Sequence, residues 1–266
     1  MIIETLSTFP DMFDSVMGAS MMRLAQEKGL LDFTAYDLRD WTHDRHRTTD
    51  DDPYGGGSGL VMKCGPIFEA YQDITGIDLG IEPPVSSAHQ QPRTGPAPRH
   101  VGAPKPKTVF LTPCGAVFDD AMACKLSNEE RLLFVCGHYE GIDERAYELA
   151  DYQISLGDYV LTSGELASMI VIDAVVRKID GVLGAEDGAL VESFAGGLLE
   201  YPQYTRPANY FGREVPSVLL SGDHGAVDSW RRSMSLSRTR DLRPDLLESA
   251  DLDDDDLNFL KSSPLC

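Results

Sequence analysis

The sequence predicts an α/β fold in which a mostly parallel sheet is covered by helices. Short apolar segments alternate with helix-like segments over much of the chain, which is the pattern of an open, doubly wound sheet. Two glycine-bearing loops, 136–145 and 155–165, follow the apolar segments 132–136 and 152–156. Because ligands bind outside the carboxyl ends of strands in such sheets, the two loops predict a binding pocket. On spacing alone, two ordinary strand-to-helix connections are the alternative.

The other elements follow from hydrophobic pattern and turn residues. Further strands are expected at 2–7, 31–38 and 109–113, and the last of them opens at Pro113 into a third loop on the ligand side. Ser127 to Glu130 match a capping box, which predicts a short helix just before the strand 132–136. Helices are also expected in two pieces between Phe9 and Gly29, and at 66–74, 165–179 and 226–235.

Two polar stretches interrupt this pattern. Residues 42–59 predict an exposed loop, and the proline-rich segment 75–107 predicts a flexible surface insertion. His43 and His46 in the first stretch could bind a metal ion, but no third ligand follows at a recognised spacing. We therefore expect no metal site.

Composition indicates a cytoplasmic protein. The 266 residues, of which 42% are hydrophobic, can form one large or two modest domains without covalent staples. The cysteines are odd in number and contain no CxxC pair, which favours free thiols: Cys64, Cys114, Cys124, Cys136 and Cys266. No run of apolar residues is long enough to cross a bilayer, so no membrane association is expected.

The formal net charge of -20 argues against binding to nucleic acid. The charge is unevenly distributed, however, because the segment 201–243 is locally basic and rich in arginine. The acidic residues gather in 245–256, where they predict a solvated run. This run is either a solubilising face or a competitor of nucleic acid for the arginines.

Four separated motifs resemble one family. They are THDRHRTTDDDPYGGGSGL at 42–60, GHYEGIDER at 137–145, SLGDYVLTSGEL at 155–166 and YPQYTRP at 201–207. Together they resemble the bacterial tRNA (guanine-N1)-methyltransferase family, which belongs to the SPOUT class of knotted methyltransferases. The resemblance covers residues 1–74 and resumes from 107 to 248.

This resemblance implies an architecture that the residue pattern alone does not. It implies that residues 1–183 form an α/β domain with a deep trefoil knot, which carries the insertion 75–107. Residues 184–197 would then form a lid or linker, and residues 198–266 a small helical domain that binds tRNA and ends in the acidic tail. It also implies a homodimer whose active sites are shared between subunits.

The resemblance further implies S-adenosyl-L-methionine as the cofactor. Glu140 and Glu165 are candidates for its ribose hydroxyls or sulfonium, or else cap helices. The residues that match the family's cofactor site are Pro113, Gly137, Glu140, Leu156, Gly157, Asp158, Tyr159, Val160, Leu161, Ser163 and Gly164.

The same resemblance implies two catalytic residues. Arg177 would stabilise the charge that develops on guanine O6, and Glu192 would remove the N1 proton. From spacing alone, Arg177 could equally form a simple ion pair with Asp173, four residues earlier on one helix. The positions that match tRNA-binding residues are Arg45, His46, Asp50, Ser193, Gln203 and Arg206.

Several of these positions depart from the family pattern. Glu192 and Glu200 stand where aspartate is usual, Gln203 where histidine is common and Ser163 where glycine is usual. The resemblance nevertheless implies methyl transfer to N1 of the guanine immediately 3′ of the anticodon in tRNA. A methyltransferase of another RNA base and a non-catalytic RNA-binding or cofactor-binding protein are the alternatives.

Overall fold

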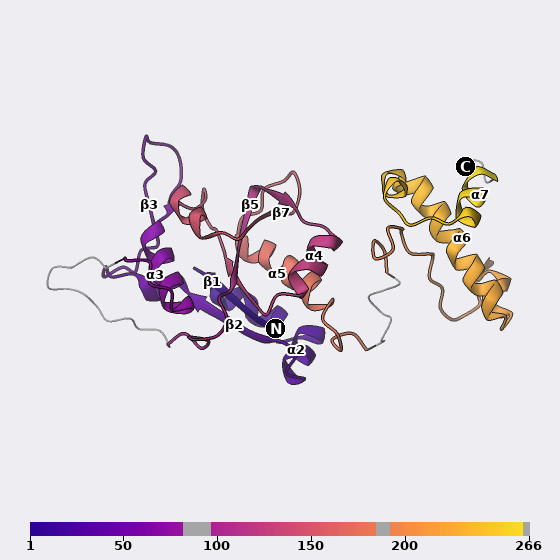
Figure 1. Ribbon diagram of the computed structural model, residues 1–266, viewed down its shortest axis with the longest axis horizontal. Helices are drawn as coiled ribbons and strands as arrows, with labels where there is room; N and C mark the ends of the chain where they lie inside the picture. Colours follow the sequence, from indigo (N-terminus) through magenta and orange to yellow (C-terminus); the bar gives the residue numbers. More distant parts are fainter. Residues whose placement is uncertain (82–96, 185–191, 263–266) are drawn as a thin grey trace. The chain divides into compact units, whose positions relative to one another are not determined.

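The computed structural model describes residues 1–81, 97–184 and 192–262. The chain divides into two compact units, Met1–Leu183 and Gly184–Cys266 (Figure 1). The centre of the predicted insertion, half of the predicted lid and Cys266 lie outside the described residues.

The first unit is built on a five-stranded sheet in the order β2-β1-β6-β5-β7. Every pair of neighbouring strands is parallel, and β1 lies between β2 and β6 with Ile3 opposite both Phe33 and Leu132. The prediction of an α/β fold with a parallel sheet is confirmed. The strands are β1 (Ile2–Ser7), β2 (Asp32–Asp37), β5 (Lys107–Val117), β6 (Arg131–Val135) and β7 (Tyr152–Ser155).

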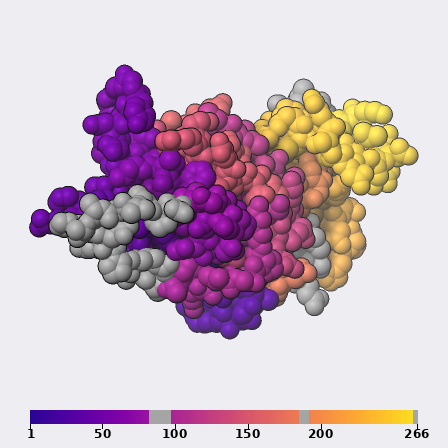
Figure 2. Space-filling model, turned by 60° about the vertical axis from the view of Figure 1, so that its left-hand side comes forward, coloured from indigo at the N-terminus to yellow at the C-terminus, as the bar shows by residue number. Residues whose placement is uncertain are grey.

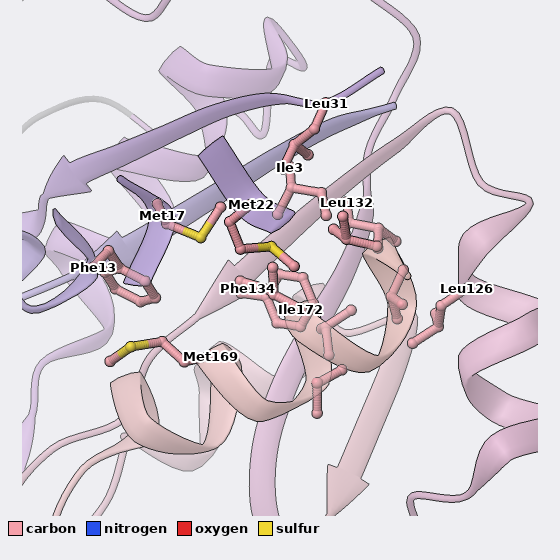
Figure 3. Packing of buried hydrophobic residues seen from close by; sticks show 14 of the residues in the cluster. Ile3, Phe13, Met17, Met22, Leu31, Leu126, Leu132, Phe134, Met169 and Ile172 are labelled. Atoms are coloured by element: carbon pink, nitrogen blue, oxygen red, sulfur yellow. The ribbon is translucent and has the colours of Figure 1, made fainter. Parts of the chain in front are cut away.

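Helices cover both faces of this sheet. Side chains along β6 point to alternate faces, and each face packs in its own apolar cluster. Leu132 and Phe134 pack in one cluster with the helices α2, α4 and α5, where Phe13, Met22 and Ile172 meet them (Figure 3). Leu133 and Val135 pack in the other cluster, with α3 and the one-turn helix Leu38–Trp41. The helices of this unit are α1 (Asp14–Met17), α2 (Ser20–Glu27), α3 (Cys64–Thr75), α4 (Asp120–Ser127) and α5 (Gly164–Val176).

The predicted capping box is wrong. Ser127 ends α4 instead of preceding a helix, and its hydroxyl donates to the Cys124 carbonyl at 2.8 Å. The actual N-cap is Asp119, whose carboxylate accepts from the Met122 amide at 2.8 Å. Serine and asparagine side chains bond nearby backbone groups at both ends of helices, so their presence alone does not tell whether a helix begins or ends there.

A charged network lies buried at the amino end of the sheet. Glu4 on β1 and Arg131 on β6 are both buried, and Arg131 Nε lies 2.8 Å from Glu4 Oε2. The Tyr36 hydroxyl donates to Glu4 Oε1 at 2.8 Å, and burial raises the pKa of that hydroxyl. These contacts satisfy a carboxylate that would otherwise be costly to bury.

The same network holds the end of the predicted insertion. His100 bridges Glu4 and Asp32, with 3.0 Å from Nδ1 to the first and 3.0 Å from Nε2 to the second. Arg131 donates to the Pro104 carbonyl at 3.2 Å and to the Ile74 carbonyl at 2.9 Å. The described part of the segment after residue 96 is therefore fastened to the sheet, which the proline-rich composition did not indicate.

The second unit contains a small hairpin and helices. The hairpin pairs β8 (Asn209–Tyr210) with β9 (Arg213–Glu214), and α6 (His224–Leu242) extends beyond the expected 226–235. The shorter elements are the one-turn helix Ser217–Leu220, the short helix Pro244–Glu248 and α7 (Asp254–Ser262). Across the described residues of both units, no helix is long and apolar enough to span a membrane.

We predict that Arg131→Leu destabilises the protein by about 3–5 kcal/mol, because it leaves the buried Glu4 carboxylate without its cation. The double change Glu4→Leu with Arg131→Leu should cost less than the single change, since neither charge then remains buried. Urea denaturation measures both free energies of unfolding.

The matched control is the exposed pair of Arg23 and Glu27. Arg23→Leu should change the free energy of unfolding by no more than about 0.5 kcal/mol. Equal effects of Arg131→Leu and Arg23→Leu would contradict the role assigned to the buried pair.

Candidate functional site

The two loops that follow β6 and β7, together with a bulge within β5, line one pocket of about 230 Å³. All the expected cofactor residues line it except Gly157 and Asp158, which lie in the same loop as Tyr159. The further lining residues, which sequence reasoning did not single out, are Leu111, Thr112, His138, Tyr139, Gly141, Ile142, Tyr147, Ile154, Ser155, Thr162 and Ala167.

Glycine allows two of these loops to touch through their backbones. The Gly164 amide donates to the Gly137 carbonyl at 2.7 Å. A Cβ on Gly164 would lie 2.6 Å from the Gly137 nitrogen and 3.1 Å from the Cys136 Cα. Since neither backbone atom can yield cheaply, only glycine fits at position 164.

The third loop is a bulge inside β5. Leu111 and Ala116 both pair with Ile154 on β7, so the residues 112–115 between them are extra and protrude from the ladder. A Cβ on Gly115 would collide with the backbone of Gln153 and Ile154, which explains glycine there. The bulge brings Thr112 and Pro113 to the pocket, as predicted for a loop opening at Pro113.

The pocket has apolar walls and a polar backbone rim. Its volume lies just below the usual range for small-ligand sites, about 300–1,000 Å³. Leu156, Ile142 and Ala167 supply aliphatic surface, while the loops supply amides and carbonyls. This arrangement suits a flat heterocycle with polar edges, such as a purine, and the close backbone approach at Gly164 fits such a cradle.

A buried carboxylate supports one wall from behind. Glu165, in the first turn of α5, is fully buried and does not line the pocket. Its Oε1 accepts a 2.5 Å hydrogen bond from Ser7 Oγ, and Ser7 Oγ accepts from the Phe9 amide at 2.8 Å. The N-cap of α5 is Ser163 instead, so Glu165 ties β1 to α5.

His138 lies between this carboxylate and the pocket. Its Nδ1 is 3.6 Å from Glu165 Oε2, and neither atom has a hydrogen-bond partner. The ring packs against Phe9 and Tyr139, with centroid separations of 4.7 and 4.9 Å. Protonated His138 would form an ion pair with Glu165, and no sequence pattern signalled this long-range contact.

The loop 42–60 is attached to the pocket through backbone hydrogen bonds. Met62, on β4 (Val61–Met62), donates to the Gly141 carbonyl at 2.9 Å, and the Glu140 amide donates to the Leu60 carbonyl at 3.1 Å. The short strand β3 (Asp50–Asp51) pairs with β4, and the connection between them protrudes from the first unit (Figure 1, Figure 2). The exposed loop is thus fixed at its base beside the 137–145 motif.

The predicted tRNA-binding residues of this loop occupy two places. Asp50 lies close to Tyr139, and burial together with the Asp50 charge raises the pKa of the Tyr139 hydroxyl. Arg45 and His46 are exposed in a turn, which Asp44 stabilises by accepting from the His46 amide at 2.9 Å. Asp50 is therefore near the pocket wall, while the two basic residues face solvent.

Arg177 is far from the pocket of its own chain. It follows α5 at the carboxyl end, whereas Gly164 begins that helix at the pocket. Thirteen residues of helix separate the two positions, which corresponds to about 20 Å. Arg177 is partly buried, and its amide donates to the Asp173 carbonyl at 3.2 Å.

The remaining predicted residues lie in the second unit. Ser193 Oγ accepts from the Glu200 amide at 3.0 Å, and the Gln203 side chain donates to the Glu200 carboxylate. Glu192 is partly buried and Arg206 is exposed. Ser193, Glu200 and Gln203 thus form one local hydrogen-bonded group that follows Glu192 in the chain.

The described residues contain no group of three or more His, Cys, Asp or Glu side chains arranged to hold a metal ion. His43 Nε2 instead lies 2.6 Å from Glu69 Oε2.

The chain matches the family model described as tRNA (Guanine-1)-methyltransferase TrmD over residues 1–249. It is 45% identical over 260 residues to a protein named tRNA (guanine-N(1)-)-methyltransferase from Desulforudis audaxviator, covering 98% of this chain and 95% of that protein. A protein of the same name from Ruminiclostridium cellulolyticum is 46% identical over 247 residues, covering 92% and 96% respectively. The match includes both units and all the loops of the pocket.

We predict that Gly164→Ala destabilises the protein by about 1–3 kcal/mol, because the new methyl group would overlap the Gly137 backbone. Gly65→Ala is the matched control, since a Cβ there meets no atom within 4 Å. The control should leave the urea midpoint unchanged or slightly raised, and equal midpoints for both variants would contradict the tight contact.

Proposed function

The chain belongs to the tRNA (guanine-1)-methyltransferase family, and on that basis we propose that it methylates N1 of the guanine immediately 3′ of the anticodon in tRNA, using S-adenosyl-L-methionine. The observation that carries this proposal is the single pocket into which three separated loops converge. Two of those loops are the 137–145 and 155–166 motifs.

The pocket residues would hold S-adenosyl-L-methionine, which when bound would supply an electrophilic methyl group. The aliphatic side chains of Leu156, Val160 and Leu161 would flank the adenine, and backbone groups around Gly137 and Pro113 would bond its polar edge and ribose. Gly157 and Asp158 complete the 155–165 loop. Because these groups belong to loops fixed by backbone contacts, little reorganisation is needed on binding.

The same loops would form a deep trefoil knot. The support for it is the passage of the chain at Gly164 directly against Gly137, close enough to exclude a Cβ. A knot would explain why loops so far apart in sequence are packed through bare backbone.

Arg177 and Glu192 would carry the chemistry on the guanine. The Arg177 guanidinium stays charged at any working pH and would stabilise negative charge on O6 as the N1 proton leaves. The Glu192 carboxylate would accept that proton. Its extra methylene relative to aspartate requires a correspondingly shifted backbone at Glu192.

The active protein would be a homodimer. Arg177 stands about 20 Å from the pocket along α5, so a second copy is needed to bring it to a reacting methyl group. Leu166 and Ile170, four residues apart on one face of α5, are 41% and 52% exposed although apolar. This face suits contact with the same helix region of a partner subunit.

The tRNA would contact both units. Arg45, His46 and Asp50 would meet it beside the pocket, and Ser193, Gln203 and Arg206 would meet it from the lid and the helical domain. A tRNA substrate and free thiols at Cys64, Cys114, Cys124 and Cys136 are consistent with a cytoplasmic location.

The function is tested with methyl-labelled S-adenosyl-L-methionine and tRNA transcripts that carry G or A immediately 3′ of the anticodon. We expect product only with G, and Glu192→Gln should lower kcat by about 10²–10⁴-fold with little change in donor affinity. Transfer irrespective of that base would favour another RNA target. Binding of donor and tRNA without transfer would make the chain a non-catalytic relative.

Shared active sites are tested by mixing two inactive variants, Arg177→Lys and Glu192→Gln. If Arg177 and Glu192 of one site come from different subunits, each mixed dimer regains one intact site. Random exchange makes half of the dimers mixed, so about a quarter of wild-type activity should return. Recovery should need time for subunit exchange, and mixtures that stay inactive after exchange would place both residues in one subunit.

A further inference from the structure

The second unit neutralises most of its own arginines. Between residues 201 and 243, five of the seven arginines bond to acidic side chains or to a backbone carbonyl: Arg231 to Asp228, Arg232 to Asp256, Arg238 to the Glu200 carbonyl, Arg240 to Asp241 and Arg243 to Asp245. Arg206 and Arg213 make no such contact within the described residues. Both are exposed; Arg206 precedes the β8–β9 hairpin, and Arg213 is the first residue of β9.

The hairpin separates its charges onto two faces. Tyr210 pairs with Arg213 across the ladder, so their side chains project from the same face. Asn209 pairs with Glu214 on the opposite face, where Asn209 Nδ2 donates to Glu214 Oε1 at 3.1 Å. The carboxylate is thereby held away from Arg213, which leaves an aromatic ring beside an unneutralised cation.

The turn presents a second aromatic ring at a conformational cost. Phe211 and Gly212 form the two-residue turn with φ of +53° and +78°, as a type I′ turn requires. This turn favours Asn-Gly, and a phenylalanine in the left-handed region costs about 1–2 kcal/mol. Phe211 gains little burial in return, because it is 84% exposed. Folding therefore does not explain this residue.

The two rings form a defined pair. Tyr210 is 61% exposed, and its ring centroid lies 4.8 Å from that of Phe211 at an interplanar angle of 83°. An edge-to-face pair leaves open ring faces toward solvent. Exposed aromatic faces beside an unpaired arginine are the combination that binds unpaired nucleotides, since bases stack on the rings and the cation contacts phosphate.

We propose that the hairpin tip, formed by Tyr210, Phe211 and Arg213, binds an unpaired nucleotide of the RNA substrate. This inference rests on the proposed function and assigns to one surface the ligand class that it would hold. A paired stem offers no open base face to the rings, so the tip discriminates loop nucleotides from duplex.

The test uses the full chain and two fluorescein-labelled RNAs, an anticodon stem-loop and a duplex of the same stem without the loop. Phe211→Asn removes the ring but supplies the residue that the turn prefers, so thermal stability should stay equal or rise. We expect this variant to bind the stem-loop about tenfold more weakly and the duplex unchanged. Phe211→Trp should retain wild-type affinity for the stem-loop.

Arg213→Gln tests the cation separately. It should weaken stem-loop binding and lower the slope of log affinity against log salt by about 0.7, the value for one contact to single-stranded phosphate. Leu242→Asn is the control, because Leu242 on α6 is apolar and 63% exposed but lies outside the hairpin. It should change neither affinity.

The outcomes separate the two proposals. A wild-type chain that methylates the guanine and binds the stem-loop, combined with unchanged affinity in Phe211→Asn, overturns the hairpin assignment alone. Equal losses on stem-loop and duplex also overturn it, because stacking on unpaired bases is then not involved. A wild-type chain that neither binds the stem-loop nor methylates tRNA overturns the proposed function and this inference with it.

Discussion

The pocket depends on one backbone contact, in which the start of α5 rests against the end of β6 at Gly164 and Gly137. Side-chain packing tolerates compensating changes, but two main chains at this separation leave no room for any Cβ. The contact fixes where α5 begins, and α5 in turn carries Glu165 against β1 and positions the 155–165 loop. The path of the backbone at Gly164 and Gly137 therefore determines the shape of the pocket, and the side chains that line it are added to that frame.

The same helix separates Arg177 from the pocket within one chain. A rigid α5 keeps its first turn at the pocket and its last turn about 20 Å away, whatever the side chains are. The residue proposed to stabilise charge, Arg177, is thus held away from the pocket of its own copy. Exposed Leu166 and Ile170 lie between these two ends, where a partner would complete the arrangement.

Features that depend on local hydrophobic pattern could be predicted from the sequence. The strand β6 was predicted because Leu132 to Val135 form a continuous apolar run, which is typical of central parallel strands. The pocket loops after β6 and β7 were predicted because glycines follow the apolar segments of these two strands. The third loop was predicted from Pro113, Cys114 and Gly115 at the end of another apolar segment. The position of α4 was not predicted correctly, because Ser127 and the residues after it are of the types that also begin a helix, whereas α4 ends at Ser127.

Contacts between residues that are distant in sequence leave no local sequence pattern, and the sequence analysis did not predict them. His138 meets Glu165, and His100 meets Glu4, only because the sheet brings together segments far apart in sequence. The hairpin was overlooked for a different reason, because Phe211 occupies a position where turn rules favour asparagine. The function of the pocket came from motif resemblance, while the separation of Arg177 from it required the helix geometry.

The buried Arg131 has a consequence for the segment between α3 and β5. One guanidinium bonds the carbonyl of Ile74 and that of Pro104, so both ends of the intervening chain are clamped at a single point. The two ends of this segment are thus held together by Arg131, and each doubling of the segment's length would cost only about 0.6 kcal/mol of loop-closure free energy. The segment between these two anchors is therefore a suitable place to graft additional sequence without disturbing the strands beneath.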